Sequence, residues 1–222
     1  MIAAMKSLLL VCLAAAVMTA GCASSPAPQD LADGDIVMIR SHSYNANAIE
    51  AVTGSRFTHC GIIFKEGGRW RVYEGAGRKG HLPLEAWIKY ESAKHEPHWK
   101  IYRLKDDAKL RQGSAVAALK HAAAKLHNTW YDHGFSWDYP KGDEERVYCS
   151  ELIWKAYKEA LGIELCPLRK MSSYPMNGEA LAILNSEFCK ESRGGQDYSP
   201  EELAVAPGDI VAGGLVVEVK RP

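Results

Sequence analysis

The sequence lacks a surplus of charge of either sign, because 27 lysine and arginine residues are matched by 27 aspartate and glutamate residues. Lys6 is the only charged residue before Cys22, so a chain that began at Cys22 would carry one more acidic than basic residue. A chain this close to neutral offers no electrostatic basis for binding nucleic acid. We therefore expect no nucleic-acid partner.

The sequence also lacks an apolar run of membrane-spanning length. The run from Leu8 to Val17 is shorter than the about 20 residues that a transmembrane helix needs. It follows Lys6 and precedes small residues, a pattern typical of an export signal. The stretch "TAGC" that ends at Cys22 resembles a bacterial lipoprotein signal, in which the cysteine becomes the lipidated first residue.

These features predict a lipoprotein signal peptide over residues 1–21, a lipid on Cys22 and a flexible tether over 22–32, where the chain is small, polar and proline-rich. Residues 33–222 then form one domain of ordinary size. The predicted location is the exported side of a membrane in the bacterial cell envelope. Plain secretion is the alternative, because Thr19 departs from the usual leucine at that position of the signal.

Cysteines are few in the predicted domain, and no CxxC motif is present. Four cysteines in about 190 residues are too few for a disulfide scaffold, and without CxxC a structural zinc site has little support. Cys166 and Cys189 flank one segment, so a disulfide between them is one reading. The four are Cys60, Cys149, Cys166 and Cys189.

Strand and helix patterns indicate an α+β fold, because strands come early and late in the chain with helices between them. Strand patterns occupy residues 35–40, 58–64, 69–74 and 99–104, with further strand material over 208–220. Helix patterns occupy 45–52, 83–90, about 107–127, 149–161 and about 178–184. The tetrapeptide "GDIV" occurs at 34–37 and again at 208–211, and both copies indicate a turn that enters a strand.

The stretch "RVYCSELIWKAYKEALG" places Cys149 on the first turn of an amphipathic helix. Cys149 shares an apolar stripe with residues at i+3, i+4, i+7, i+8 and i+11, while Glu151 and Lys155 fall on the opposite face. A buried cysteine of this kind is often a small packing residue. The alternative is a nucleophile, because unpaired N–H groups and the helix dipole favour a thiolate and can stabilise an oxyanion.

His59 is the candidate base, because of its place on a strand. If residues 65–68 form the loop of the hairpin, His59 pairs with Glu74, and both share a mostly apolar face. A carboxylate against an imidazole is the orienting pair that a nucleophile–base site needs. An ordinary ion pair is the alternative, and a loop at Gly67–Gly68 would place Glu74 opposite the neighbours of His59 instead. Alternation sends Cys60 to the other face, into packing.

A second group of polar residues lies close together in the chain and offers metal-ligand chemistry. Its spacing matches no known metal motif, so we interpret it as a polar loop and expect neither a metal nor a cofactor. The group comprises His127, Asp132, His133 and Asp138.

Taken together, five stretches resemble the permuted papain-like cysteine hydrolases of the YiiX/YebB type, a branch of the NlpC-like superfamily. They occur in the family's order between residues 33 and 165, as "DGDIV", "SRFTHCGIIF", "VYEGAG", "YDHGFSWD" and "VYCSELIWKAYKEALGIEL". The resemblance implies a circularly permuted papain-like fold, with an antiparallel sheet packed against helices. It also implies Cys149 as nucleophile, His59 as base, Glu74 as orienting residue, and Tyr131 or Tyr148 as a helper at the oxyanion.

The resemblance implies an exported thiol hydrolase that cleaves an amide or ester through an acyl-enzyme and needs no cofactor. The superfamily includes cell-wall peptidases and lipid acyltransferases. Because the sequence shows no wall-binding module, we favour an amidase on a small acyl or lipid-like substrate over one on a cell-wall peptide. The alternative is a non-catalytic envelope lipoprotein that binds a ligand in a papain-like cleft.

Overall fold

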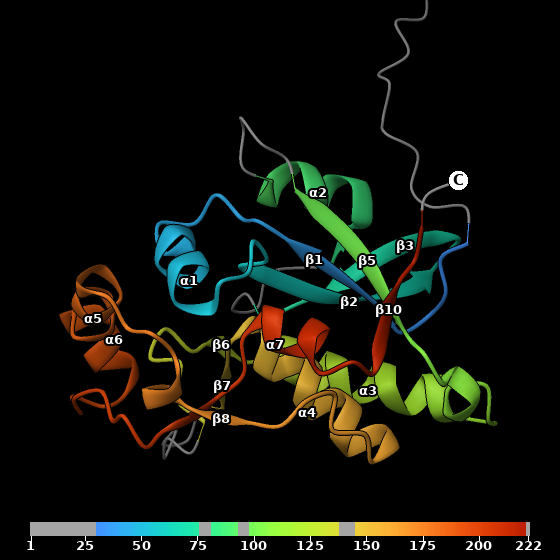
Figure 1. Ribbon diagram of the computed structural model, residues 1–222. Coiled ribbons are helices and arrows are strands. Elements are labelled where there is room, and N and C mark those ends of the chain that lie inside the picture. The colour runs from blue at the N-terminus through green and yellow to red at the C-terminus, as the bar shows by residue number, and fades with distance from the viewer. Residues whose placement is uncertain (1–29, 76–80, 93–97, 138–144, 221–222) are drawn as a thin grey trace, which may run out of the picture.

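A six-stranded antiparallel sheet forms the centre of the molecule (Figure 1). The computed structural model describes residues 30–75, 81–92, 98–137 and 145–220. The predicted signal peptide, Cys22 and Asp138 lie outside the described residues. The strand order is β10 (Val216–Glu218), β5 (Trp99–Leu104), β1 (Asp35–Ile39), β2 (His59–Glu66), β3 (Arg69–Tyr73) and β4 (Leu82–Pro83).

Helices cover both faces of the sheet, so its central strands are buried on each side. Alternate residues of β1 belong to different hydrophobic clusters, as the period of two in a strand requires. Ile36 and Met38 pack toward α3 (Ala115–His127) and α4 (Cys149–Leu161). Val37 and Ile39 pack toward α2 (Leu84–Glu91). The predicted α+β architecture is confirmed.

Three shorter helices gather at one end of the sheet, at the left of Figure 1. They are α1 (Ala46–Thr53), α5 (Gly178–Leu184) and α6 (Glu187–Ser192). Two small ribbons complete this end: β6 (Trp130–Tyr131) runs parallel to β7 (Arg146–Val147), and β8 (Arg169–Lys170) runs antiparallel to β9 (Leu203–Ala204). The ribbons and α6 were not predicted from the sequence, because elements this short carry little periodic signal.

The helix predicted from residue 107 to residue 127 is divided in the structure. A single 3₁₀ turn, η1 (Asp107–Lys109), is followed by Gly113 with a φ of +48°. A residue in that left-handed conformation cannot continue an α-helix, so α3 begins only at Ala115. The prediction of one continuous helix was wrong for this reason. A second 3₁₀ turn, η2 (Met171–Ser173), follows β8.

The second "GDIV" stretch is helical, contrary to the expectation from the first. Gly34, at a φ of +89°, turns the chain into β1, as predicted. At the other site Pro207 takes the first position of α7 (Pro207–Ala212), and the Asp209 carboxylate accepts the N–H of Ala206 at 2.7 Å. Proline at the first position and a capping carboxylate both favour a helix start. The flanking residues therefore decide the conformation of the shared tetrapeptide.

The cysteines of the described residues are all free thiols, so Cys166 and Cys189 do not form a disulfide. Cys166 lies in the large cluster under α4, and Cys189 is buried on α6. Among the described residues, none of the helices combines the length and apolar character that crossing a bilayer requires.

Candidate active site

Helix α4 begins at Cys149, as predicted, and holds that residue in the large hydrophobic cluster. Gly162, at a φ of +67°, ends the helix and donates its N–H to the carbonyl of Lys158 at 3.0 Å. At the other end, Leu152 donates to the Tyr148 carbonyl at 3.0 Å. The N–H groups of the first turn are left for other partners, as at every helix N-terminus.

The buried surface of α4 is wider than its predicted stripe. Glu151 was assigned to the exposed face, but the structure buries it completely. Its carboxylate accepts the N–H of Tyr148 at 3.2 Å and pairs with Lys155 at 2.6 Å, so the buried charge is compensated. Ser150 donates to the carbonyl of Val205 at 2.7 Å. These contacts fix the position and rotation of the first turn.

The β2–β3 hairpin has a tighter turn than the favoured prediction. Glu66 pairs with Arg69, which leaves Gly67 and Gly68 as a two-residue loop with φ values of +54° and +79°. The pairing shifts by two positions, and Glu74 falls beside Gly61 rather than directly opposite His59. The predicted register was therefore wrong. A shift of two positions keeps every side chain on its face, so the predicted partners still meet.

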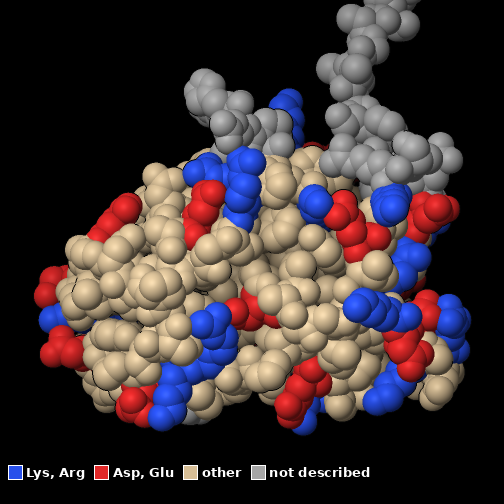
Figure 2. Space-filling model, in the orientation of Figure 1, with Lys and Arg blue, Asp and Glu red and all other residues tan. Residues whose placement is uncertain are grey.

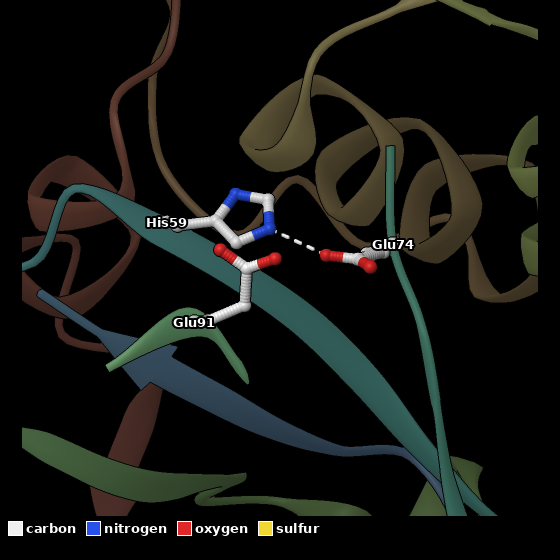
Figure 3. A group of neighbouring side chains, drawn as sticks. All are labelled: His59, Glu74 and Glu91. Atoms are coloured by element: carbon white, nitrogen blue, oxygen red, sulfur yellow. Dashed lines mark hydrogen bonds and ion pairs between the residues drawn. The ribbon is translucent and has the colours of Figure 1, made fainter. Parts of the chain in front are cut away.

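The imidazole of His59 and the carboxylate of Glu74 form a short, partly buried hydrogen bond, Nε2 to Oε2, of 2.5 Å. Figure 3 shows the second ring nitrogen of His59 pointing away from Glu74. Trp87 of α2 stacks on the imidazole with ring centroids 5.5 Å apart and fixes the plane of the ring. The pair therefore presents the second imidazole nitrogen in a fixed direction.

The pKa of Cys149 is held well below that of an ordinary thiol. The largest cause is a hydrogen bond from the Cys60 thiol, which outweighs the opposing effect of burial, and the charge and hydrogen bond of His59 lower the pKa further. Burial alone would lower the pKa of His59, but Cys149 and Glu74 raise it well above its usual value. A thiolate beside an imidazolium is thus the favoured state of the pair.

Cys60 does not have the purely packing role that was predicted. It does point to the face opposite His59, as strand alternation requires, but that face carries α4. Its thiol therefore lies within hydrogen-bonding reach of Cys149, and burial together with the Cys149 thiolate raises the pKa of Cys60 well above its usual value. The sequence predicted the face correctly but not what covers it.

Gly75 allows the start of α4 to approach the sheet closely. A Cβ on this residue would lie 2.9 Å from the Tyr148 carbonyl carbon and 3.1 Å from the Cys149 nitrogen. The pairing of β2 with β3 stops at Ile62 and Tyr73, so the start of β2 is uncovered on that side. The first turn of α4 occupies this edge, which explains how Cys149 reaches both Cys60 and His59.

Of the four residues considered as a metal group from the sequence, the three that the structure describes, His127, Asp132 and His133, do not form a metal-binding group. His127 on α3 is buried, and its Nδ1 donates to the Glu74 carbonyl at 2.7 Å, so it anchors the backbone of Glu74. Asp132 accepts hydrogen bonds from the N–H groups of Gly134 and Ser136 and holds its own loop. His127 falls at i+8 on the apolar stripe that starts at Leu119, and this phase is the signal that would have indicated its burial.

The two tyrosines proposed as oxyanion helpers differ in their surroundings. Tyr131 pairs in register with Val147 through β6 and β7, and both tyrosines line the same pocket as Cys149. Burial raises its pKa well above the usual value, with Cys149 the next cause. The Tyr148 hydroxyl accepts the N–H of Val205 at 3.1 Å, and Cys149 is not among the causes of its raised pKa. Tyr131 is therefore the better placed of the two.

A pocket with an empty volume of about 710 Å³, part of it open to solvent, extends from Cys149 between α1 and α5. Apart from the Cys149 thiolate, none of the described residues that line it carries a charge. Ile49 and Val52 come from α1, Ala180 and Ile183 from α5, and further apolar side chains come from η2 and from the segment around β9. The sequence had left this C-terminal part without a role, and the structure brings it to Cys149.

One group among the described residues has the geometry to hold a metal ion, namely His59, Glu74 and Glu91. One ligand atom from each lies within 4.8 Å of the others. Figure 3 shows the Glu91 side chain directed from α2 toward the other two. Glu91 was not singled out from the sequence, because it is far from His59 in the chain and belongs to no motif.

The family model for "permuted papain-like amidase enzyme, YaeF/YiiX, C92 family" matches residues 30–207. The chain belongs to this family of permuted papain-like amidases. The match extends through η2, α5 and the segment around β9, so it includes the pocket as well as Cys149, His59 and Glu74. The predicted family and fold are thereby confirmed.

Two relatives support the same assignment. The uncharacterized protein YiiX of Escherichia coli K12 is 27% identical over 175 residues, which are 78% of each chain. A crystal structure described as that of the metalloprotein YiiX from Escherichia coli O157:H7 superposes with a TM-score of 0.70 at 27% identity. It covers 86% of this chain and 97% of that one.

Proposed function

We propose that this member of the amidase family is a thiol hydrolase that cleaves the amide or ester bond of an acyl or lipid-like substrate. The observation that carries the proposal is the uncharged, apolar pocket that opens at Cys149. Concave sites lined mostly by apolar groups suit apolar ligand groups. A cell-wall peptide would bring charged groups into this space without a partner, which is costly.

In the proposed reaction the Cys149 thiolate attacks the carbonyl carbon of the substrate. N–H groups of the first turn of α4, and the Tyr131 hydroxyl, stabilise the oxyanion. His59 donates its proton to the leaving amine or alcohol as the carbon–heteroatom bond breaks, and a thioester with Cys149 remains. His59 then takes a proton from water, the resulting hydroxide attacks the thioester, and the acid and the free thiol are released. Glu74 orients His59 and stabilises the imidazolium.

The surface over the pocket walls is consistent with an apolar substrate. Figure 2 shows charged side chains of both signs scattered over the molecule, and an area over α1, α5 and α6 that is mostly uncharged. Three large apolar residues exposed in this region are Tyr44, Leu181 and Phe188. Exposed apolar side chains of this kind favour contact with an amphiphilic substrate.

A chain-length series tests the substrate class. Hydrolysis of acyl p-nitroanilides from C2 to C12 is expected to show kcat/KM rising with chain length, because each buried methylene contributes about 0.8 kcal/mol. Ala180→Trp fills the pocket and is expected to abolish the gain for long chains while C2 turnover persists. Ala182→Trp, on the exposed face of the same helix, is the matched control. Preference for muropeptides over all acyl substrates would contradict the proposal.

A thiol-reactive probe separates an enzyme from a protein that only binds a ligand. Near neutral pH, mass spectrometry should find Cys149 labelled much faster than Cys60, because the pKa of Cys149 is lowered and that of Cys60 is raised. Equal, slow labelling of both thiols in the folded protein would favour the non-catalytic, ligand-binding alternative.

The proposed location is the exported side of the bacterial envelope, with a lipid on Cys22. Cys22→Ala is expected to release the protein from the membrane fraction, and intact mass measurement of the parent should find a diacyl or triacyl modification on Cys22. Membrane retention of the variant, together with an unmodified Cys22 in the mature parent, would contradict lipidation.

A further inference from the structure

Glu91 adds a second carboxylate to the His59–Glu74 pair, and the reaction above gives it no role. It ends α2, four residues after Trp87, so both side chains lie on the helix face that meets His59. Figure 3 shows Glu91 and Glu74 approaching the imidazole from two different elements. Their ligand atoms and a ring nitrogen of His59 lie within 4.8 Å of one another.

The backbone holds Glu91 at this place. Its carbonyl accepts the N–H of His42 at 3.0 Å, and the His42 ring lies 3.2 Å from the same oxygen. Ser92, the next residue, pairs with Ser41 just beyond the end of β1. The end of α2 is thus tied to the strand next to β2, and the Glu91 side chain is only partly buried.

We infer that His59, Glu74 and Glu91 form a regulatory site for a zinc-class divalent cation. Imidazole nitrogen and carboxylate oxygen are both zinc ligands, and zinc sites with three protein ligands leave a fourth position open. Mg²⁺ and Ca²⁺ prefer sites made entirely of oxygen. Ligand atoms around tetrahedral zinc lie about 3.3 Å apart, a separation that falls within the 4.8 Å spanned by the three groups.

Metal binding at this site switches the hydrolase off, and this consequence rests on the proposed function. The Nε2 atom that hydrogen-bonds to Glu74 is the ring nitrogen on the side of the two carboxylates. When the cation bonds to Nε2, His59 releases its Nε2 proton to solvent and keeps only the proton on Nδ1. The ring is then neutral, and it can no longer act as the acid that protonates the leaving group.

The binding test uses the full-length Cys149→Ala protein, so that no thiolate at the nucleophile position can act as a ligand. After treatment with EDTA and removal of the chelator, Zn²⁺ is titrated in competition with a chromogenic chelator. We expect one equivalent to bind, with Mg²⁺ unable to displace it. Glu91→Gln in the same background should weaken binding by at least about 10-fold, since even partners outside the ligand shell contribute that much.

Glu85→Gln is the matched control, because Glu85 lies on the exposed face of the same helix. Glu91→Asp keeps the carboxylate with a shorter reach and is expected to fall between the parent and Glu91→Gln. Circular dichroism of each variant checks the fold. The site is refuted if the Cys149→Ala protein binds no stoichiometric Zn²⁺, or if Glu91→Gln binds it as tightly as Glu85→Gln.

The regulatory test compares turnover by the Cys149-containing protein with and without Zn²⁺, each variant normalised to its own metal-free rate. The parent and Glu85→Gln should be inhibited at the same concentration, and Glu91→Gln should need at least about 10-fold more Zn²⁺. Stoichiometric binding without inhibition would overturn the switch. The Zn²⁺ titration of the Cys149→Ala protein uses no substrate. Its result therefore stays valid even if the proposed hydrolase function is wrong.

Discussion

The two faces of the sheet contribute different parts of the site. The face under α3 and α4 carries the larger hydrophobic cluster and supplies Cys149 and Cys60. The face under α2 carries a smaller cluster, and on that side Trp87 stacks on His59. The proposed nucleophile therefore comes from the more extensive core, while the proposed base is held by Glu74 and by the stacked ring of Trp87.

The two groups meet only at the uncovered start of β2. There the β2–β3 pairing has ended, and Gly75 lets the first turn of α4 approach the sheet edge. Cys149, from the α4 face of the sheet, and His59, from the α2 face, can therefore meet beside the start of β2. This arrangement suggests that the thiolate is stabilised mainly from the α4 face and that proton transfer is controlled from the α2 face. The following predictions test that division.

The largest expected effect is the loss of turnover when Cys149 or His59 is replaced by alanine. Cys149→Ala and His59→Ala should each lower kcat/KM by about 10⁴-fold or more, and the double variant should be little worse than either, because residues that act as a unit are not additive. Rates for the acyl p-nitroanilide with the best kcat/KM provide the measurement. Losses that multiply in the double variant would mean that the two faces act independently.

Removal of the Tyr131 hydroxyl is expected to cost about 10²-fold in kcat, because an oxyanion donor in a buried site contributes that much. Tyr148→Phe should cost far less, since its hydroxyl is bonded to the N–H of Val205 rather than directed to Cys149. Alkylation of Cys149 should be unchanged in Tyr131→Phe. Equal losses in the two phenylalanine variants would remove the distinction between the tyrosines.

A methyl group at Gly75 tests the meeting point of the faces. Gly75→Ala should push the Tyr148–Cys149 backbone away from the sheet and lower kcat by about 10²-fold, as expected for a displacement near 1 Å between reacting groups. Gly178→Ala is the control, because a Cβ there meets nothing within 4 Å. Full activity in a folded Gly75→Ala protein would show that the close approach is not needed.

The smallest effect expected is that of Cys60→Ala, measured as the pH dependence of Cys149 alkylation. Because the Cys60 hydrogen bond and the His59 charge both lower the pKa of Cys149, loss of either should move the profile to higher pH. His59→Ala should move it toward the free-thiol value of about 8.5, and Cys60→Ala should move it less, with a few-fold loss of turnover. Cys60→Ser keeps a donor and should fall between parent and Cys60→Ala.

Cys166→Ala serves as the control for the loss of a buried thiol. Burial raises the pKa of Cys166 to about 12, and this residue is not among the causes of the shift at Cys149. Its substitution should leave the alkylation profile unchanged. If Cys166→Ala and Cys60→Ala have the same effect, the hydrogen bond between Cys60 and Cys149 does not contribute to thiolate stability.

The sequence by itself determined the local elements and the directions of their side chains. The apolar stripe that begins at Cys149 and the glycine at position 162 predicted α4, because the helical period and the left-handed cap are properties of the backbone. Strand alternation placed His59 and Glu74 on one face, and this held even though the register was wrong by two positions. A period of two is insensitive to such a shift.

Only the tertiary structure decided which elements cover each face and which distant segments meet. The sequence could not predict that α4 lies over Cys60, that Glu91 approaches His59, or that α5 and the segment around β9 line the pocket at Cys149. Local periodicity depends on the bond geometry of each residue. The choice of contacts depends instead on the sum of many small burial energies over the whole chain, and no short stretch of sequence contains that sum.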